Sequence, residues 1–360
     1  MIKVLITGIG GSAALGFVNS LYDSPEKFYI IGCDSNKYYL ERAICDEKYL
    51  IPSCNDKNYL KIIKKIIELT KPDFIYSQTD VEIEKLSEIR EIFDEYNIKY
   101  FWPPKETVKI CMNKYLSYQA WKKAGIKVPK TYIITKTDDL LKAFEDFGSP
   151  LWIREIKGAF GKGSLPVKSF EEAKMWIDIK NGWGNFSAAE MLEPDKMVTW
   201  QSIWFKGKLI VAQTRKRLYW EFANRVPSGV TGLTGTGITI KDKKVDKIAI
   251  KSIIAVDKKP HGIFSVDLTY DKKGVPNPTE INIGRFFTTH YFFTKAGLNM
   301  PYIFIKLGLE GKLPFKIKNK INPLPSNLAW IRGLDFLPKL SNIKEINLHE
   351  EKLKKMLKTI

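Results

Sequence analysis

The chain has 360 residues, of which 44% are hydrophobic, enough to bury the cores of two or three compact units. Its formal net charge is +18, but the lysines are spread along its length without an aromatic-basic or reader motif, so we expect no nucleic-acid function. No apolar run reaches the roughly eighteen residues of a membrane span, and the scattered cysteines and histidines argue against disulfides or zinc. We therefore expect a cytoplasmic globular protein.

Residues 1–100 alternate short apolar segments with helical patterns. We expect strands at 3–7, 29–34 and 74–78, with helices reaching about residue 22 and covering 58–70. This alternation predicts a parallel sheet with crossover helices.

Two prolines at 103 and 104 interrupt the chain, and a helix over 114–125 follows, ended by Gly125 and the later Pro129. Residues 130–190 then read as strand, helix, strand, glycine-rich turn, strand and helix. Longer strands and antiparallel hairpins are expected over 196–310. The Pro/Lys-rich tail should end in an amphipathic helix at about 344–358.

The glycine-rich turn at 6–16 admits a dehydrogenase reading. Asp34 ends the second strand, where a dinucleotide-binding protein places its ribose acid, and Tyr118 and Lys122 have the Tyr-xxx-Lys spacing of a short-chain dehydrogenase. Against this alternative, Tyr118 and Lys122 follow the double proline and lie inside a helix with capping signals of its own.

A second glycine-rich segment, 150–164, has the residues needed to hold a triphosphate. A strand delivers Arg154 and Lys157 into a loop whose free N–H groups can cover phosphates, with the small residues Gly158, Gly161, Gly163 and Ser164. Lys162 is followed by glycine rather than Ser or Thr, which excludes a Walker loop. The alternative is a simple glycine-rich hairpin turn.

Candidate metal ligands lie in the segment 262–285, which reads as two strands. If the connection takes residues 272–275, Asp271 faces Pro276 and Asp267 falls opposite Glu280. Glu280 and Asn282 are two residues apart and share a face. Asp267, Glu280 and Asn282 would then offer three oxygen ligands to a hard cation such as Mg²⁺. The alternative is a solvated strand face with incidental acids.

Together with the segments 112–132 and 188–200, these motifs resemble the ATP-grasp superfamily, closest to its carbamoyl-phosphate-synthase-like and carboxylate–amine ligase branch, over residues 1 to about 310. The resemblance implies an α/β and α+β chain: a Rossmann-like parallel-sheet (pre-ATP-grasp) domain followed by a two-lobed ATP-grasp fold. The expected boundaries are 1–104 for the first domain, 105–195 for the N-terminal part with a lid at about 130–190, 196–310 for the C-terminal lobe with the Mg²⁺ site, and 311–360 for the basic tail.

The resemblance also implies residue roles. Lys114, Arg154, Lys157 and the glycine loop would contact the phosphates, and Glu190, Met191 and Leu192 would form the adenine hinge. Asp267, Glu280 and Asn282 would bind the metal; Arg285, Arg154 and Asn282 are the catalytic candidates. Two departures from the family pattern affect these roles. Pro194, Asp195 and Lys196 stand where a ribose-binding glutamate is usual, so Asp195 is the substitute. Asn-Ile-Gly-Arg replaces the usual Asn-Pro-Arg, which displaces Arg285 by one residue.

We therefore expect a ligase that activates a substrate carboxylate as an acyl phosphate, using ATP and Mg²⁺ (with Mn²⁺ as the alternative ion), for capture by an amine. The expected partners are small-molecule carboxylate and amine substrates, with a homodimer as a compatible assembly. Candidate substrate contacts are Arg215, Lys216 and Arg217, the loop 228–237, Thr288 and Thr289; the segment 213–217 could equally be an exposed strand edge. An ATP-grasp kinase and a noncatalytic nucleotide-binding regulator are the alternatives that share these motifs.

Overall fold

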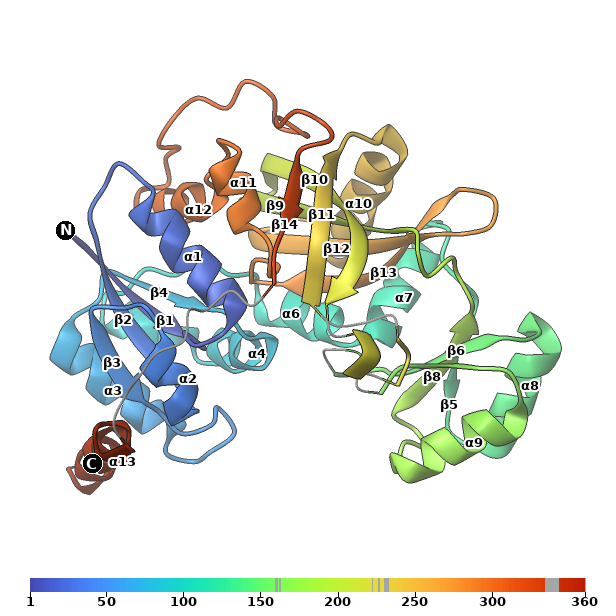
Figure 1. Ribbon diagram of the computed structural model, residues 1–360, viewed down its shortest axis with the longest axis horizontal. Helices are drawn as coiled ribbons and strands as arrows, with labels where there is room; N and C mark the ends of the chain where they lie inside the picture. The colour runs from blue at the N-terminus through green and yellow to red at the C-terminus, as the bar shows by residue number, and fades with distance from the viewer. Residues whose placement is uncertain are drawn as a thin grey trace.

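The computed structural model describes residues 1–158, 161, 163–221, 223–225, 227–229, 233–333 and 343–359. Their strands form three sheets, which Figure 1 shows side by side along the molecule. The glycine-loop residue Lys162 lies outside the described residues.

The first sheet is parallel, as expected, with the order β3-β2-β1-β4. Its strands are β1 (Ile2–Thr7), β2 (Phe28–Asp34), β3 (Glu47–Leu50) and β4 (Phe74–Ser77). The helices of this region are α1 (Ser12–Tyr22), α2 (Lys37–Arg42), α3 (Tyr59–Thr70), α4 (Asp80–Glu88) and α5 (Arg90–Glu95). Helix α3 buries an isoleucine stripe that includes Ile62 and Ile66, because positions three and four apart share a helix face.

Helices α6 (Lys105–Met112) and α7 (Lys114–Lys123) connect this domain to the rest of the chain. Asn113 starts α7 by accepting hydrogen bonds from the amides of Tyr115 (3.0 Å) and Leu116 (3.1 Å) through its side-chain oxygen. Gly125, at φ 68°, lies just beyond its C-terminal end. This cap places Lys114 at the first turn of a fixed helix.

The second sheet is antiparallel and belongs to the expected lid region. Its order is β5-β8-β6-β7, from β5 (Thr131–Ile134), β6 (Leu151–Glu155), β7 (Leu165–Val167) and β8 (Phe186–Glu190). Helices α8 (Thr137–Phe147) and α9 (Phe170–Ile179) pack against it, and the unit has a hydrophobic cluster of its own that includes Leu140, Ile153 and Phe186. A separate core allows this unit to move as one body.

The third sheet has the order β13-β12-β9-β10-β11-β14 and is antiparallel. Its strands are β9 (Met197–Phe205), β10 (Lys208–Glu221), β11 (Leu233–Ile240), β12 (Gly262–Tyr270), β13 (Pro276–Ile283) and β14 (Ala329–Ile331). Associated with it are η1 (Ala223–Arg225), α10 (Lys243–Val256), α11 (Tyr291–Lys295) and α12 (Met300–Glu310). Phe17 and Tyr76 of the first domain pack with Phe286 and Phe304 in one aromatic cluster, so the first and third sheets share a core.

The described residues beyond 311 pack back onto the first and third sheets, an arrangement that the tail's composition did not indicate. Strand β14 pairs with β11, and the Asn322 amide donates to Asp246 of α10 (2.9 Å). Helix α13 (Ile343–Lys358) lies against α2 and β3, where Lys37 and Glu350 form an ion pair of 2.6 Å. Among the described residues, no helix is long and apolar enough to cross a membrane.

Candidate functional site

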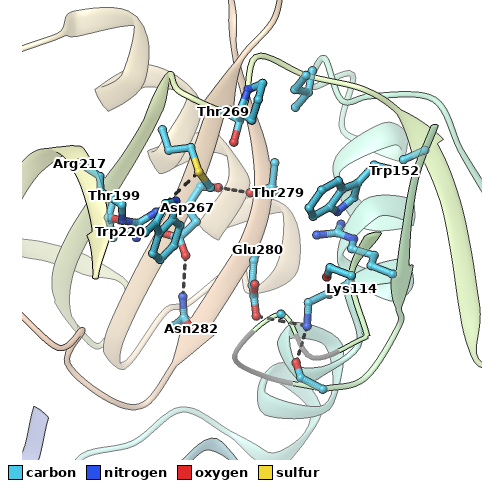
Figure 2. A pocket seen from close by; sticks show the side chains of 18 of the residues that line it. Lys114, Trp152, Thr199, Arg217, Trp220, Asp267, Thr269, Thr279, Glu280 and Asn282 are labelled. Atoms are coloured by element: carbon cyan, nitrogen blue, oxygen red, sulfur yellow. Dashed lines mark hydrogen bonds and ion pairs between the residues drawn. The ribbon is translucent and has the colours of Figure 1, made fainter. Parts of the chain in front are cut away.

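A cavity of about 250 Å³ lies between the lid sheet and the third sheet. Figure 2 shows residues from both sides pointing into it: Lys114 and Trp152 on one side, Asp267, Thr199 and Arg217 on the other. The glycine loop, the end of β8 and strands β9 to β13 also contribute to its walls.

The β12–β13 hairpin brings the two candidate acids together by a different register from the expected one. The connection takes residues 271–275, so Tyr270, not Asp271, pairs with Pro276. At a bulge, Thr279 has no paired residue on β12. This extra residue shifts the register by one, so Asp267 lies opposite Glu280 as expected. Asp271 belongs to the turn, because its carboxylate accepts hydrogen bonds from the amides of Lys273 and Val275, each 2.9 Å.

Asp267, Glu280 and Asn282 all line the cavity. The Asn282 amide nitrogen donates to Asp267 Oδ2 (3.0 Å), and the Thr199 hydroxyl donates to Asp267 Oδ1 (2.6 Å). Two carboxylates and an amide oxygen form a donor set suited to Mg²⁺, so the residues fit the ion that the sequence implied. No cluster of three or more His, Cys, Asp or Glu suited to a metal occurs among the described residues, and the third oxygen of this candidate set is the amide oxygen of Asn282.

Glu280 lies near three cations, Lys114, Arg154 and Arg285. Lys114 Nζ lies 3.2 Å from Glu280 Oε1 and donates to the carbonyl of Gly158 (2.7 Å). Burial raises the pKa of the Glu280 carboxyl, but Lys114, Arg154 and Arg285 outweigh burial and hold that pKa below its ordinary value. Glu280 is therefore ionised at neutral pH.

Arg154, on β6, is half-buried and also lines the cavity. Burial lowers the pKa of its guanidinium, and Glu280 opposes that effect. Its Nε finds no hydrogen-bond partner among the described residues. A half-buried guanidinium with spare donors is suited to binding an anion such as a phosphate.

The glycine loop lies over this end of the cavity, which Gly158, Gly161, Gly163 and Ser164 line. Gly158 has φ 142° and Gly161 φ 64°, conformations that residues with a Cβ rarely adopt. Lys157 is not among the described lining residues. It points to the first domain instead, where its Nζ lies 3.6 Å from Glu84 of α4.

The expected adenine hinge, Glu190, Met191 and Leu192, lines the cavity where β8 ends. The Glu190 carboxylate accepts a hydrogen bond from the Lys130 amide (2.8 Å), which fixes the side chain at the start of β5. Asp195, the expected ribose contact, is exposed and is not among the described lining residues. Pro194 lines the cavity in its place.

Arg285 lies at the cavity wall, but its guanidinium is already occupied. Its Nε and Nη2 contact both carboxylate oxygens of Asp80, the latter at 2.8 Å, and Nη2 also donates to Asn282 Oδ1 (2.7 Å). Burial would lower the pKa of Arg285, yet the ion pair with Asp80 raises it. The structure thus gives Arg285 a positioning role toward Asn282.

The segment 213–217 is not an exposed strand edge, because β10 lies between β9 and β11. Arg215 is 1% exposed, and both Arg215 and Arg217 line the cavity, whereas Lys216 is not among the described lining residues. Thr288 lines the cavity, and Thr289 accepts a hydrogen bond from Arg215 (2.8 Å). Residues 230–232 of the candidate loop 228–237 lie outside the described residues.

The first glycine-rich turn does not leave the space that a dinucleotide requires. Asp34 Oδ2 accepts a hydrogen bond from the Gly10 amide (2.9 Å), and a Cβ at Gly10 would lie 2.5 Å from Tyr39, which covers the turn. Tyr118 is buried in α7, and neither it nor Lys122 is among the described lining residues of the cavity. The geometry disfavours the dehydrogenase alternative.

Comparison with known proteins agrees with this geometry. Residues 4–101 match a family model described as the PylC-like N-terminal domain. The carbamoyl phosphate synthase large chain of Pyrococcus furiosus is 27% identical over 138 residues, which are 37% of this chain and 13% of that protein. The chain thus spans a small part of the length of this curated relative.

Two solved structures match most of the chain. Biotin carboxylase from Campylobacter jejuni, in a β,γ-ATP complex, has a TM-score of 0.67 and 19% identity, covering 88% of this chain and 72% of that one. L-amino acid ligase from Bacillus licheniformis has a TM-score of 0.64 and 14% identity, covering 86% and 74%. The chain has the ATP-grasp fold. The predicted fold is thereby confirmed, and so is the predicted resemblance to carbamoyl-phosphate-synthase-like proteins.

Several residues in or beside the site of this chain escaped the sequence reasoning. Thr199 and Trp220 line the cavity, and Asp80 holds Arg285 from the first domain. Thr199 and Trp220 lie on strands β9 and β10, where the period-two pattern only assigns them a face. Asp80 is 205 residues from Arg285 in the sequence, and no local signal links the two.

Proposed function

We propose that this ATP-grasp chain is an ATP-dependent ligase that activates a substrate carboxylate as an acyl phosphate for capture by an amine. The observation that carries the proposal is the arrangement of Asp267, Glu280 and Asn282 opposite Lys114 and Arg154, under a glycine loop. Such a site combines metal ligands, cations for phosphates and a backbone cover in one cavity. The names of the structural neighbours, a carboxylase and an amino acid ligase, support the same chemistry.

In this proposal the nucleotide lies along the lid side of the cavity. The hinge Glu190–Leu192 takes the adenine, and the loop amides with Lys114 and Arg154 take the phosphates. Lys157 and Asp195 receive no role, because neither belongs to the described cavity wall.

Asp267, Glu280 and Asn282 would hold Mg²⁺. When bound, the ion supplies charge neutralisation to the phosphate oxygens and orients them. Lys114 forms an ion pair with the Glu280 carboxylate in this structure. Nucleotide binding would redirect the Lys114 ammonium toward phosphate oxygens.

The reaction then has two steps. A carboxylate oxygen of the substrate attacks the γ-phosphorus, the bond from that phosphorus to the β,γ-bridging oxygen breaks, and ADP leaves with the electron pair. The amine nitrogen next attacks the acyl carbon, the bond from carbon to the phosphate oxygen breaks, and inorganic phosphate leaves while the amine proton passes to phosphate or water. Arg154 and Lys114 balance the developing charge, and the lid keeps water from the acyl phosphate.

ADP release in the presence of MgATP tests the proposal. The purified chain would be assayed against amino acids and hydroxy acids, singly and in pairs, with mass spectrometry of the products. We expect release that depends on two co-substrates and yields an amide. Release that needs one acceptor and yields a phosphorylated product would assign a kinase instead, and hydride transfer without nucleotide turnover would restore the dehydrogenase reading.

A further inference from the structure

The end of the cavity away from the glycine loop contains two arginines: Arg215 is buried and Arg217 is half-buried. Arg215 and Arg217 are two residues apart on β10, so their side chains share a face, and both line the cavity. Figure 2 shows Arg217, with Thr199 and Trp220, on the far side of Asp267 and Glu280 from Lys114 and Trp152. The proposed phosphate contact Lys114 lies on the opposite side, which leaves the side of the arginines for a second substrate.

The hydrogen-bond partners of Arg215 are neutral. Its Nη1 donates to the hydroxyls of Thr234 (2.9 Å) and Thr289 (2.8 Å), and its Nη2 donates to that of Thr199 (2.7 Å). Its Nε is buried and lacks a partner among the described residues. Three hydroxyls therefore orient the guanidinium without neutralising it.

Arg217 has the same character. Its Nε donates to the Thr234 hydroxyl (2.9 Å), its Nη1 approaches Met197 Sδ (3.7 Å), and its guanidinium carbon lies 3.5 Å from the centre of the Trp220 ring. Within the described part of the chain neither arginine forms an ion pair, in contrast to Lys114 with Glu280 and Arg285 with Asp80. At the end of the cavity near the glycine loop, the Lys114 ammonium is thus paired with a carboxylate. At the end with Arg215 and Arg217, the described residues leave a net positive charge.

A buried cation without a counter-charge costs free energy, and two adjacent cations repel each other. Burial lowers the pKa of Arg217 to about 10, and burial followed by repulsion from Arg217 lowers that of Arg215. The negative charge of Asp267 opposes this effect at both arginines. The oxygens of Asp267, however, already accept hydrogen bonds from Thr199 and Asn282. Such an arrangement is expected where a bound anion supplies the compensation.

We propose that Arg215 and Arg217 form a binding subsite for an oxyanion, a carboxylate or a phosphate, carried by the co-substrate of this chain. The inference rests on the proposed ligase function and names the class of its co-substrate. The Thr199 hydroxyl connects Arg215 to Asp267, so the subsite lies one side chain from the proposed metal ligands. An anion held there anchors one end of the co-substrate, and its other end reaches the phosphates.

Isothermal titration calorimetry of the full chain with two probes, inorganic phosphate and succinate, tests the subsite. Each probe is titrated with and without saturating MgADP into wild type, Arg217→Gln, Arg217→Lys and the control Lys216→Gln. Lys216 lies on the same strand and carries the same charge, but it is not part of the described cavity wall. Thermal denaturation verifies that each variant is folded.

We expect wild type to bind at least one probe, Arg217→Gln to weaken that binding at least about tenfold, and Lys216→Gln to leave it within twofold. Phosphate binding alone assigns a phosphorylated co-substrate, and succinate binding alone a carboxylate-bearing one. Arg217→Lys keeps the charge but loses the planar fork, so it should weaken binding partially, and it decides the question if Arg217→Gln does not fold.

The subsite is overturned if wild type binds neither probe, or if Lys216→Gln weakens binding as much as the Arg217 variants. Failure of the wider ligase proposal would look different: MgADP alone would not bind, and the titrations without nucleotide would still report on the arginines.

Discussion

Asp80, the first residue of α4, forms a two-point ion pair with Arg285, which follows β13. The same guanidinium donates to Asn282, so an acid of the first domain fixes the orientation of a proposed metal ligand. The first domain therefore supports the site without lining its centre.

Asp80→Asn should disturb both stability and the site. The substitution leaves the Arg285 charge without its counter-ion. We expect the free energy of unfolding to fall by about 3 kcal/mol. This value is at the lower end for a buried pair, because both side chains keep some exposure. Urea denaturation measures the loss, and MgATP turnover should fall with it. Glu88→Gln, on the same helix but in an exposed pair, is the control; equal stability of the two variants would contradict the role given to Asp80.

Glu280→Gln tests the metal ligands. The amide cannot supply the carboxylate charge, so we expect Mg²⁺-dependent ADP release to fall at least about 100-fold with the fold retained. Calorimetry with MgADP and circular dichroism separate the two effects. Asp271→Asn, in the turn of the same hairpin, should keep near wild-type turnover, and an active Glu280→Gln variant would rule out the proposed ligand set.

Thr199→Val should weaken both the proposed Mg²⁺ site and the proposed oxyanion subsite. It removes the hydroxyl that donates to Asp267 and accepts from Arg215, and the loss of a buried hydrogen-bonding group costs about 1–3 kcal/mol of stability. We expect weaker binding of both Mg²⁺ and the oxyanion probe in calorimetry. Thr199→Ser should restore both, because serine keeps the hydroxyl; a serine variant no better than valine would show that the hydroxyl is not responsible.

His290 predicts an acid sensitivity of the whole fold. Burial lowers its pKa from 6.5 to about 4, so the folded state keeps the ring neutral while the unfolded state protonates first. This contribution to stability is complete above pH 6.5 and falls by about 1.4 kcal/mol per pH unit between pH 6.5 and about 4. Denaturation midpoints at several pH values for wild type and His290→Asn measure it. The variant should show a shallower slope, and identical slopes would contradict the assignment.

The sequence determined the elements and pointed to the candidate residues of the site. Periodicity placed α3 and the strands of the first sheet, and the order of the glycine loop and the acids in 262–285 pointed to the ATP-grasp fold. Local signals suffice here because helix and strand periods, caps and loop glycines act over a few residues.

Only the tertiary structure decided the partners. The bulge at Thr279 sets the register of Asp267 and Glu280, and Asp80 reaches Arg285 across 205 residues. The tail's return to β11 and α2 is equally invisible in its composition. Among the described residues, Arg285 forms an ion pair whereas Arg215 and Arg217 form none. These differences depend on contacts between segments far apart in the chain, and no local pattern encodes those contacts.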